Sequence, residues 1–384
     1  MQLSQKFTAV EDEMNKILIE RSAPVRGVLL SALSSTNILL LGPAGIAKSM
    51  LINEWNKRIT GSAYFEWLLS KFSTPDELFG PISLTGLEKE RYKRVTTGKL
   101  PEANTAFLDE IFKSNSSILN ALLTILNERK FFNDGVPVTV PLVTVAGASN
   151  EIPDSDDGLD AFFDRFLLKY HLAAIHEPSA FIRMLKLAAL EPSATVSLEE
   201  IKTAQGEIES VKIDDSILSQ IVKIREGIKR DITLVSDRTF KISMKILKAE
   251  AWLNGKDEVL MDNLELYRHI CWTKPEQEKS IHSQILTLIS PEKNKILEYY
   301  SQVLDMEKDL YKKKEAGGRQ TAVVETSQKV NEACVKIADL KKAMMARKQD
   351  VKEVEKIENE LEEIKIRIAR DILGVDISKL RPKA

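Results

Sequence analysis

The sequence predicts an α/β domain with a parallel sheet, followed by two helical regions. Three observations carry this prediction. Short, nearly all-apolar runs alternate with helical patterns up to about residue 175, which is typical of buried parallel strands. Strand signals then disappear, and beyond about 275 the chain is highly charged and almost entirely helical in pattern. The predicted domains are 1–175, 176–275 and 276–384.

The first region contains three expected parallel strands and one hairpin. The strands are the runs at 37–41, 105–109 and 141–150, which are apolar on both faces. The run Val136 to Val140 resembles one arm of a hairpin, with Asn133-Asp134-Gly135 as its turn. A parallel sheet with an added hairpin is therefore expected.

The second region contains three amphipathic helix patterns. The first lies in "EPSAFIRMLKLAAL". The second follows the capping candidates Asp214 and Asp215, and the third begins at Ser236 and ends at Gly255. We expect a compact helical domain.

The third region carries two apolar stripes with steps of three and four residues, separated by a skip or hairpin near 345–353. "EAGGRQ" at 315–320 is the clearest break. We expect two or three long helices in a small coiled bundle, in which the stripes bury each other. The stripe residues are Ala333, Ile337, Leu340 and Met344, then Val354, Ile357, Leu361, Ile364 and Ile368.

Composition favours some classes of protein function and cellular location over others. The 55 basic and 57 acidic residues give a net charge of -2, whereas nucleic-acid binding proteins usually have a basic excess. Cys271 and Cys334 lack metal-ligand spacing and fit free thiols in a reducing compartment. No apolar run approaches the roughly 20 residues that cross a bilayer, and the first residues lack a signal-peptide pattern. We expect a cytoplasmic protein.

"GPAGIAKS" at 42–49 is a candidate phosphate-binding loop. Gly42 and Gly45 allow a tight turn that points backbone N–H groups at an anion. Lys48 would reach the β- and γ-phosphates, and the Ser49 hydroxyl would ligate Mg²⁺. The loop follows an apolar strand and leads into a helical pattern, as this motif requires. Alanine at position 47 replaces the usual last glycine, and it is tolerated sterically if its φ is negative.

Asp109 and Glu110 end the apolar run "TAFLD" and form the second candidate group. One carboxylate would hold Mg²⁺ and the other would orient and polarise a water. Many strands end in an acidic cap, but sixty-odd residues after a phosphate loop the pattern predicts a nucleotide site. The second carboxylate favours hydrolysis over phosphoryl transfer to a small substrate.

Three further polar residues are candidates with open alternatives. Asn150 ends the next strand and would contact the γ-phosphate or the water, or it is a turn asparagine. Arg165 lies in a helical, otherwise apolar context. It either forms a salt bridge to Asp160 or Asp164, or acts as an arginine finger for a neighbouring subunit. Arg238 begins a helix and could reach phosphate, or it is a surface arginine.

In the order "GPAGIAKS", "FLDE", "ASN", "DRF" and "SDR", these motifs resemble the AAA+ ATPases of the MoxR family. The strings "STPDELFGPISL" (73–84), "TTGKLPEANTAFLDEIFK" (96–113), "ILNALLTILNER" (118–129) and "ASNEIP" (148–153) resemble its RavA subfamily. The resemblance covers about residues 15–275 and weakens in the C-terminal helices.

The resemblance implies a P-loop AAA+ core with a helical lid, ATP and Mg²⁺ as ligands, and a role for each motif. Asp109 and Glu110 would be the Walker B pair, Asn150 sensor 1, Arg165 the arginine finger, and Arg238 sensor 2, acting in cis or in trans. Mg²⁺ would be held by Ser49 and Asp109. The Walker A segment would comprise Gly42, Pro43, Ala44, Gly45, Ile46, Ala47, Lys48, Ser49 and Met50.

The resemblance also implies a projecting insert at 78–100 and a hairpin near 130–141, both facing a central pore or a client. Family members form hexameric rings and act as chaperone-like remodellers, often with a partner that carries a von Willebrand factor A domain. The β-rich insert domain of RavA itself is expected to be absent here, since no strand-rich stretch follows "EAGGRQ".

The sequence therefore predicts a Mg²⁺-dependent ATPase that remodels or matures a protein partner. A nucleic-acid-stimulated motor is the main alternative, and the near-neutral charge and the lack of an appended OB-fold or basic arm count against it. A small-molecule kinase or GTPase is a second alternative, disfavoured by the helical lid and the lack of an N-K-x-D motif. A non-hydrolysing scaffold is a third, which Glu110 disfavours.

Overall fold

The protein is described from a computed structural model, which covers residues 2–151, 160–188, 190–315, 320–346, 349 and 351–373. The chain forms two compact units, Met1–Ile281 and His282–Ala384. The first unit includes both the α/β region and the helical region that the sequence separates at residue 175, so that separation stays a prediction.

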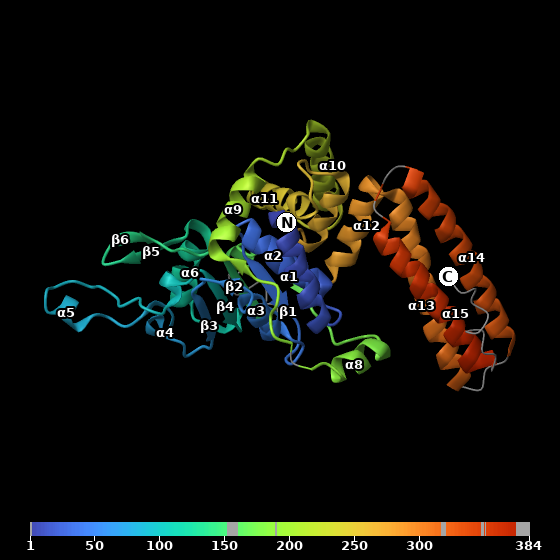
Figure 1. The fold of residues 1–384 in the computed structure, drawn as a ribbon, viewed down its shortest axis with the longest axis horizontal. Coiled ribbons are helices and arrows are strands. Elements are labelled where there is room, and N and C mark those ends of the chain that lie inside the picture. The colour runs from blue at the N-terminus through green and yellow to red at the C-terminus, as the bar shows by residue number, and fades with distance from the viewer. Residues whose placement is uncertain are drawn as a thin grey trace. The chain divides into compact units, whose positions relative to one another are not determined.

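A parallel sheet forms the centre of the first unit (Figure 1). It has five strands in the order β3-β4-β7-β1-β8. The three expected strands are confirmed as β1, β4 and β7, and their burial on both faces explains their apolar runs. The two outer strands were not predicted. The strands are β1 (Ile38–Leu41), β3 (Tyr64–Leu68), β4 (Thr105–Asp109), β7 (Thr144–Ser149) and β8 (Leu168–His171).

Strand β8 corrects the expected helical context around Arg165. Helix α7 (Asp160–Phe163) ends before Arg165, and Leu168 pairs with Ile38 of β1. The run "LKYH" is too short and too polar to indicate a strand by itself, so pairing with β1 decides its conformation. Its Lys169 is nevertheless buried, with Nζ 5.1 Å and 5.7 Å from the ring centroids of Phe163 and Trp272.

Helices α2 and α3 pack on the sheet and on each other. Helix α2 approaches β8 so closely that a Cβ at Gly27 would lie 2.3 Å from the Tyr170 ring. Glycine at that position allows the contact. The helices around the sheet are α1 (Leu3–Ile17), α2 (Ser22–Leu33), α3 (Lys48–Asn56), α6 (Ser116–Glu128) and the 3-10 turns η1 (Leu100–Glu102) and η2 (Ile111–Lys113).

The 78–100 insert and the hairpin extend together from the sheet domain (Figure 1). The hairpin is confirmed, and its turn is the two residues Asp134 and Gly135, whose φ values of 57° and 77° fit a type I′ turn. Arg91 Nε donates to Asp134 Oδ2 at 2.8 Å, and Arg94 N donates to Asn133 Oδ1 at 2.7 Å. The two segments are therefore tied together. Their elements are α4 (Pro75–Phe79), α5 (Leu84–Leu87), β5 (Lys130–Asn133) and β6 (Val136–Thr139).

Two helices of the helical region begin at the predicted capping residues. Asp214 caps α10, and the Ser236 hydroxyl accepts from Thr239 N–H at the start of α11. Helix α9 was not predicted, although Ser197 and Glu200 form a capping box that signals it. The elements are α8 (Pro178–Leu185), α9 (Leu198–Glu209), α10 (Asp215–Asp231), α11 (Asp237–Leu253), η4 (Met261–His269) and α12 (Gln277–Ile289).

A strand of the helical region, paired with a strand of the α/β region, also contradicts the expectation that strands end near 175. Strand β9 (Val196–Ser197) pairs with β2 (Ile59–Thr60). A buried carboxylate anchors the preceding segment: Glu13 accepts from the backbone N–H groups of Ser193 and Ala194 and from Arg58 Nη2 at 2.8 Å. These strands are fixed by long-range contacts, so local sequence could not indicate them.

The second unit is a bundle of α13 (Pro291–Glu315), α14 (Gln320–Ala346) and α15 (Lys352–Leu373), which confirms the expected long helices. Both predicted stripes line its core, and α13 adds Ile296, Val303 and Leu310. The described part of this unit contains no strand, and residues 316–319 of the predicted break lie outside the described residues. Among the described helices of the whole chain, none has the length and apolar character needed to cross a membrane.

Candidate nucleotide-binding site

The loop Gly42–Ala47 connects β1 to α3 at the carboxyl edge of the sheet. Gly42 has a φ of 141°, and a Cβ there would lie 2.3 Å from the carbonyl oxygen of Leu172. Gly45 has a φ of 81°, also in the region that favours glycine. The loop then opens directly into the N-terminus of α3, where free backbone N–H groups and the helix dipole favour an anion.

Ala47 corrects the expectation of a negative φ. It occupies the N-cap position of α3 with φ 70° and ψ 27°, a left-handed conformation. Alanine in this region carries strain of about 1–2 kcal/mol. The loop geometry thus forces onto alanine a conformation that the more usual glycine adopts freely.

Lys48, the first residue of α3, lies inside the loop. Its Nζ donates to the carbonyl oxygens of Gly42 at 2.5 Å and Pro43 at 2.9 Å and to Asn150 Oδ1 at 2.6 Å. Burial lowers the Lys48 pKa, while the charges of Asp109 and Glu110 oppose that shift. A buried ammonium whose partners are mainly neutral oxygens can exchange them for phosphate oxygens.

Glu110 and Asn150 face Lys48 across the strand ends. Asn150 Nδ2 donates to Glu110 Oε1, and Lys48 donates to the other end of the same amide. Glu110 Oε2 is buried without a hydrogen-bond partner, although Lys113 Nζ lies 3.3 Å away. Glu110 has a φ of 52°, so this carboxylate is held by a left-handed backbone at the end of β4. The unsatisfied oxygen is suited to accept a hydrogen bond from a water.

Asp109 and Ser49 are the candidate Mg²⁺ ligands. Asp109 ends β4 and is half-buried, and its Oδ1 accepts from Glu110 N–H at 2.9 Å. Ser49 is exposed in the first turn of α3. A carboxylate and a hydroxyl are hard oxygen donors of the kind Mg²⁺ prefers, and Mg²⁺ usually takes further ligands from phosphate and water. Among the described residues no group of three acidic, His or Cys side chains could hold a metal without a nucleotide.

Arg165 lies at the other edge of the sheet. It follows α7 and precedes β8, and its carbonyl oxygen accepts from Asn37 Nδ2 at 3.1 Å, just before β1 begins. Arg238, in the first turn of α11, donates to Asn127 Oδ1 at 2.5 Å, beside the Leu126 carbonyl that also accepts from Asn37. Both arginines are therefore at the amino edge.

The five steps along the chain from Asn37 to Gly42 span about 16 Å of β-strand. This separation exceeds the length of an arginine side chain. The structure brings Lys48, Asp109, Glu110 and Asn150 together, and it does not bring Arg165 or Arg238 to the phosphate loop of the same chain.

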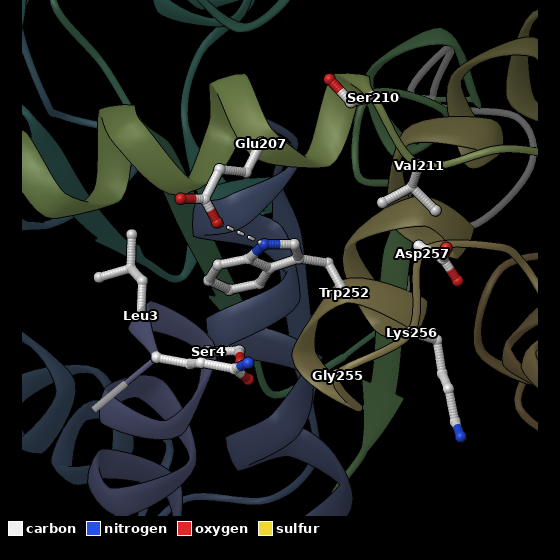
Figure 2. Close-up of a pocket in the computed structure, with 10 residues that line it drawn as sticks. Leu3, Ser4, Glu207, Ser210, Val211, Trp252, Gly255, Lys256 and Asp257 are labelled. Carbon is white, nitrogen blue, oxygen red and sulfur yellow. Dashed lines mark hydrogen bonds between the residues drawn. The ribbon is translucent and has the colours of Figure 1, made fainter.

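A separate cavity of about 480 Å³ lies between α1, α9 and α11 (Figure 2). Leu3, Val211 and Trp252 line it together with charged groups that include Lys256 and Asp257. The Trp252 indole N–H donates to Glu207 Oε2 at 2.8 Å across its wall. None of the phosphate-loop residues lines this cavity, so it is distinct from the candidate nucleotide site.

Comparison with known proteins shows the family to which the chain belongs. The family model for the MoxR domain in MoxR-vWA-beta-propeller ternary systems matches residues 5–211, more than half of the chain. The chain belongs to the MoxR family of AAA+ ATPases. A second family model, for an AAA lid domain, matches residues 216–285, so the MoxR core is followed by the lid expected of this class.

Two relatives of this MoxR protein are uncharacterized proteins of Methanocaldococcus jannaschii. One is 39% identical over 273 residues, covering 71% of each chain, and the other is 38% identical over 282 residues, covering 73% of this chain and 74% of the relative. A solved structure of a candidate ATPase from Cytophaga hutchinsonii has the same fold, with a TM-score of 0.61. It is 19% identical and covers 75% of this chain and 95% of that one.

Sequence reasoning missed one buried residue beside the candidate phosphate-binding loop. Arg21, at the start of α2, donates through Nη2 to the Ala173 carbonyl at 2.5 Å and through Nε to the Ile46 carbonyl at 3.4 Å. It joins α2, the loop and the end of β8. Burial lowers the Arg21 pKa, and Glu20 opposes the shift. A single arginine before an apolar helix gives no signal of this role in the sequence.

Proposed function

We propose that this chain hydrolyses ATP with Mg²⁺ at sites shared between neighbouring copies in a ring, and that the cycle remodels a protein partner. One observation carries the proposal. The residues suited to bind phosphate and activate water lie at the carboxyl edge of the sheet, and two arginines lie at the amino edge.

In the proposed site, the loop N–H groups and Lys48 bind the phosphates of ATP. Lys48 exchanges carbonyl oxygens of the loop for phosphate oxygens as ATP enters. Mg²⁺, held by Ser49 and Asp109, would neutralise charge on the phosphate oxygens. Glu110 orients and polarises the attacking water through its unsatisfied oxygen, and Asn150 fixes the opposite oxygen of that carboxylate.

Arg165 and Arg238 would serve the site of the adjacent subunit. Burial and then the charge of the nearby Arg238 lower the Arg165 pKa, although 20% of the side chain is exposed. A phosphate from a neighbour that meets the exposed part of this side chain would favour the charged forms of both arginines. Contacts between different faces of identical subunits build a ring when the rotation closes. A hexamer in which Arg165 is the arginine finger follows from the family resemblance. The resemblance leaves open whether Arg238, as sensor 2, acts in cis or in trans, and its place at the amino edge supports action in trans.

The partner is proposed to be a protein with a von Willebrand factor A domain. The matched family model describes MoxR domains of systems that contain such proteins, which supports this choice. The arm formed by the insert and hairpin supports partner contact, because Leu84, Tyr92, Val95 and Phe132 are exposed on it. The RavA-like strings favour that branch of the family, and a cytoplasmic location is proposed with it.

The test mixes two inactive variants. Arg165→Ala should bind ATP but hydrolyse it about 10³- to 10⁵-fold more slowly. Glu110→Gln should also bind ATP without hydrolysing it, because its water is no longer polarised. At equal amounts and random mixing, about one interface in four has an intact pocket and an intact finger, so activity should recover toward that fraction.

The matched control is Arg230→Ala, which removes an exposed arginine paired with the adjacent Asp231. This variant should keep full activity by itself. Mixtures of Arg165→Ala and Glu110→Gln that exchange subunits, confirmed by fluorescence energy transfer, and yet stay inactive would exclude the shared site.

A further inference from the structure

Asp164 connects the turn that carries Arg165 to the helix that carries Arg238. Its Oδ1 accepts from Thr239 Oγ1 at 2.9 Å and from Ser236 Oγ at 3.3 Å, at the start of α11. Its Oδ2 lies 3.4 Å from Arg165 Nη1. One carboxylate therefore contacts both the α7–β8 turn and the first turn of α11.

The surroundings of Asp164 are rich in positive charge. Arg165, Arg238 and the buried Lys169 lie around it. Burial and then the charge of Arg238 lower the Arg165 pKa, and burial lowers the Lys169 pKa to about 8; the Asp164 carboxylate opposes both shifts. The charges of Arg165 and Arg238 therefore repel each other, and the Asp164 carboxylate, which contacts both segments that carry them, favours the charge of Arg165.

Hydrogen bonds hold both arginines that this connection joins. The Arg165 backbone is fixed to the sheet edge by Asn37, and the Arg238 side chain is fixed to α6 by Asn127. Only Nη1 is directed to Asp164 and 20% of the Arg165 side chain is exposed, so the guanidinium keeps further donors for another acceptor. Asp164 thus orients the guanidinium without occupying all of its donors.

We propose that Asp164 is a positioning residue for ATP hydrolysis in the adjacent subunit, since it aims Arg165 and locks it to the Arg238-bearing helix so that both arginines meet the γ-phosphate as one unit. This inference rests on the shared site proposed above. Asp164 itself touches neither the nucleotide nor the water. Its loss should act on the neighbour's turnover and leave ATP binding by its own chain intact.

The experiment uses the mixing assay with defined roles. Glu110→Gln subunits are finger donors, because their own pocket is inactive, and Arg165→Ala subunits are pocket donors. Asp164→Asn keeps the shape and an acceptor for Thr239 but removes the charge. Placed in the finger donor, it should lower the recovered kcat about 10- to 100-fold, because a small misplacement of a catalytic group has an effect of this size. The KM should change less than about threefold, because ATP binding is left to the other subunit.

Placed in the pocket donor, the same substitution should leave the recovered activity unchanged. The matched control in the finger donor is Asp237→Asn, which removes an exposed carboxylate beside Arg238 that pairs with Arg225. It should also leave recovery unchanged. Thr239→Val, which removes the hydroxyl donor to Asp164, is a second variant for the finger donor and should lower kcat in the same direction.

The outcomes separate the two proposals. Equal losses from Asp164→Asn in the finger donor and in the pocket donor would show a general effect on folding and overturn the inference. Full recovery with both Asp164→Asn and Thr239→Val in the finger donor would also overturn it, while leaving the shared site intact. No recovery in the parent mixture, despite subunit exchange, would overturn the shared site and this inference together.

Discussion

The left-handed conformation of Ala47 gives a prediction with an unusual sign. Replacing alanine by glycine normally destabilises a protein by about 0.4–1 kcal/mol, because the unfolded chain gains freedom. At φ 70° and ψ 27°, glycine also removes strain of about 1–2 kcal/mol. Ala47→Gly should therefore leave the free energy of unfolding unchanged or raise it by up to about 1.5 kcal/mol.

Ala44→Gly is the matched control. Ala44 lies three residues earlier in the same loop, is exposed, and does not have a positive φ. Glycine there should only destabilise, by about 0.4–1 kcal/mol. The unfolded-state contribution is the same for both variants, so the difference in stability between them, about 1–2 kcal/mol, measures the strain at Ala47.

The assay is urea unfolding of the nucleotide-free protein followed by tryptophan fluorescence. All four tryptophans, Trp55, Trp67, Trp252 and Trp272, belong to the first unit, so the signal reports the unit that contains the loop. The midpoint of Ala47→Gly should lie at or above that of the native protein, and the midpoint of Ala44→Gly below it. Equal losses in both variants would refute the strain at Ala47.

Three further results are expected. Lys48→Ala should abolish binding of a fluorescent ATP analogue without unfolding the chain. Ala47→Gly should change ATP affinity by less than about tenfold, or 1.4 kcal/mol. An affinity of Lys48→Ala equal to that of the native protein would place the nucleotide elsewhere. Glu13 should give an acid-labile part of stability: burial raises its pKa, but hydrogen bonds from Ser193, Ala194 and Arg58 outweigh this and lower it to about 2. Because the folded pKa lies below the ordinary 4.5, this stabilisation is complete above pH 4.5 and is lost as the pH falls toward 2. Glu13→Gln should remove that pH dependence of the urea midpoint and lower the free energy of unfolding by about 1–3 kcal/mol at neutral pH. An unchanged fall of the midpoint between pH 4.5 and 2 in Glu13→Gln would contradict this assignment. A chain ending at Ile289 should bind ATP as tightly as the full chain does. Any loss should be confined to assembly, measured by light scattering, or to partner binding, measured by pull-down. A folded truncation that no longer binds ATP would contradict the assignment of the second unit to assembly or partner binding.

The sequence by itself determined the elements whose signals are local. The apolar runs of β1, β4 and β7, the caps at Asp214 and Ser236, and the stripes of α14 and α15 are all confirmed. Each depends on residues within a few positions of one another, through periodicity, a capping hydrogen bond or a continuous apolar face. The phosphate-loop and acidic motifs are short local strings as well, and their order along the chain was enough to indicate the family.

Only the tertiary structure decided the features that join distant parts of the chain. Strand β8 exists because it pairs with β1, and Ala47 has a positive φ because the loop must turn from β1 into α3. Arg165 and Arg238 lie at the amino edge because Asn37 and Asn127 hold them there, across the sheet from Lys48. The contacts of the two arginines join residues 128 and 111 positions apart, and local sequence patterns carry no information on such contacts.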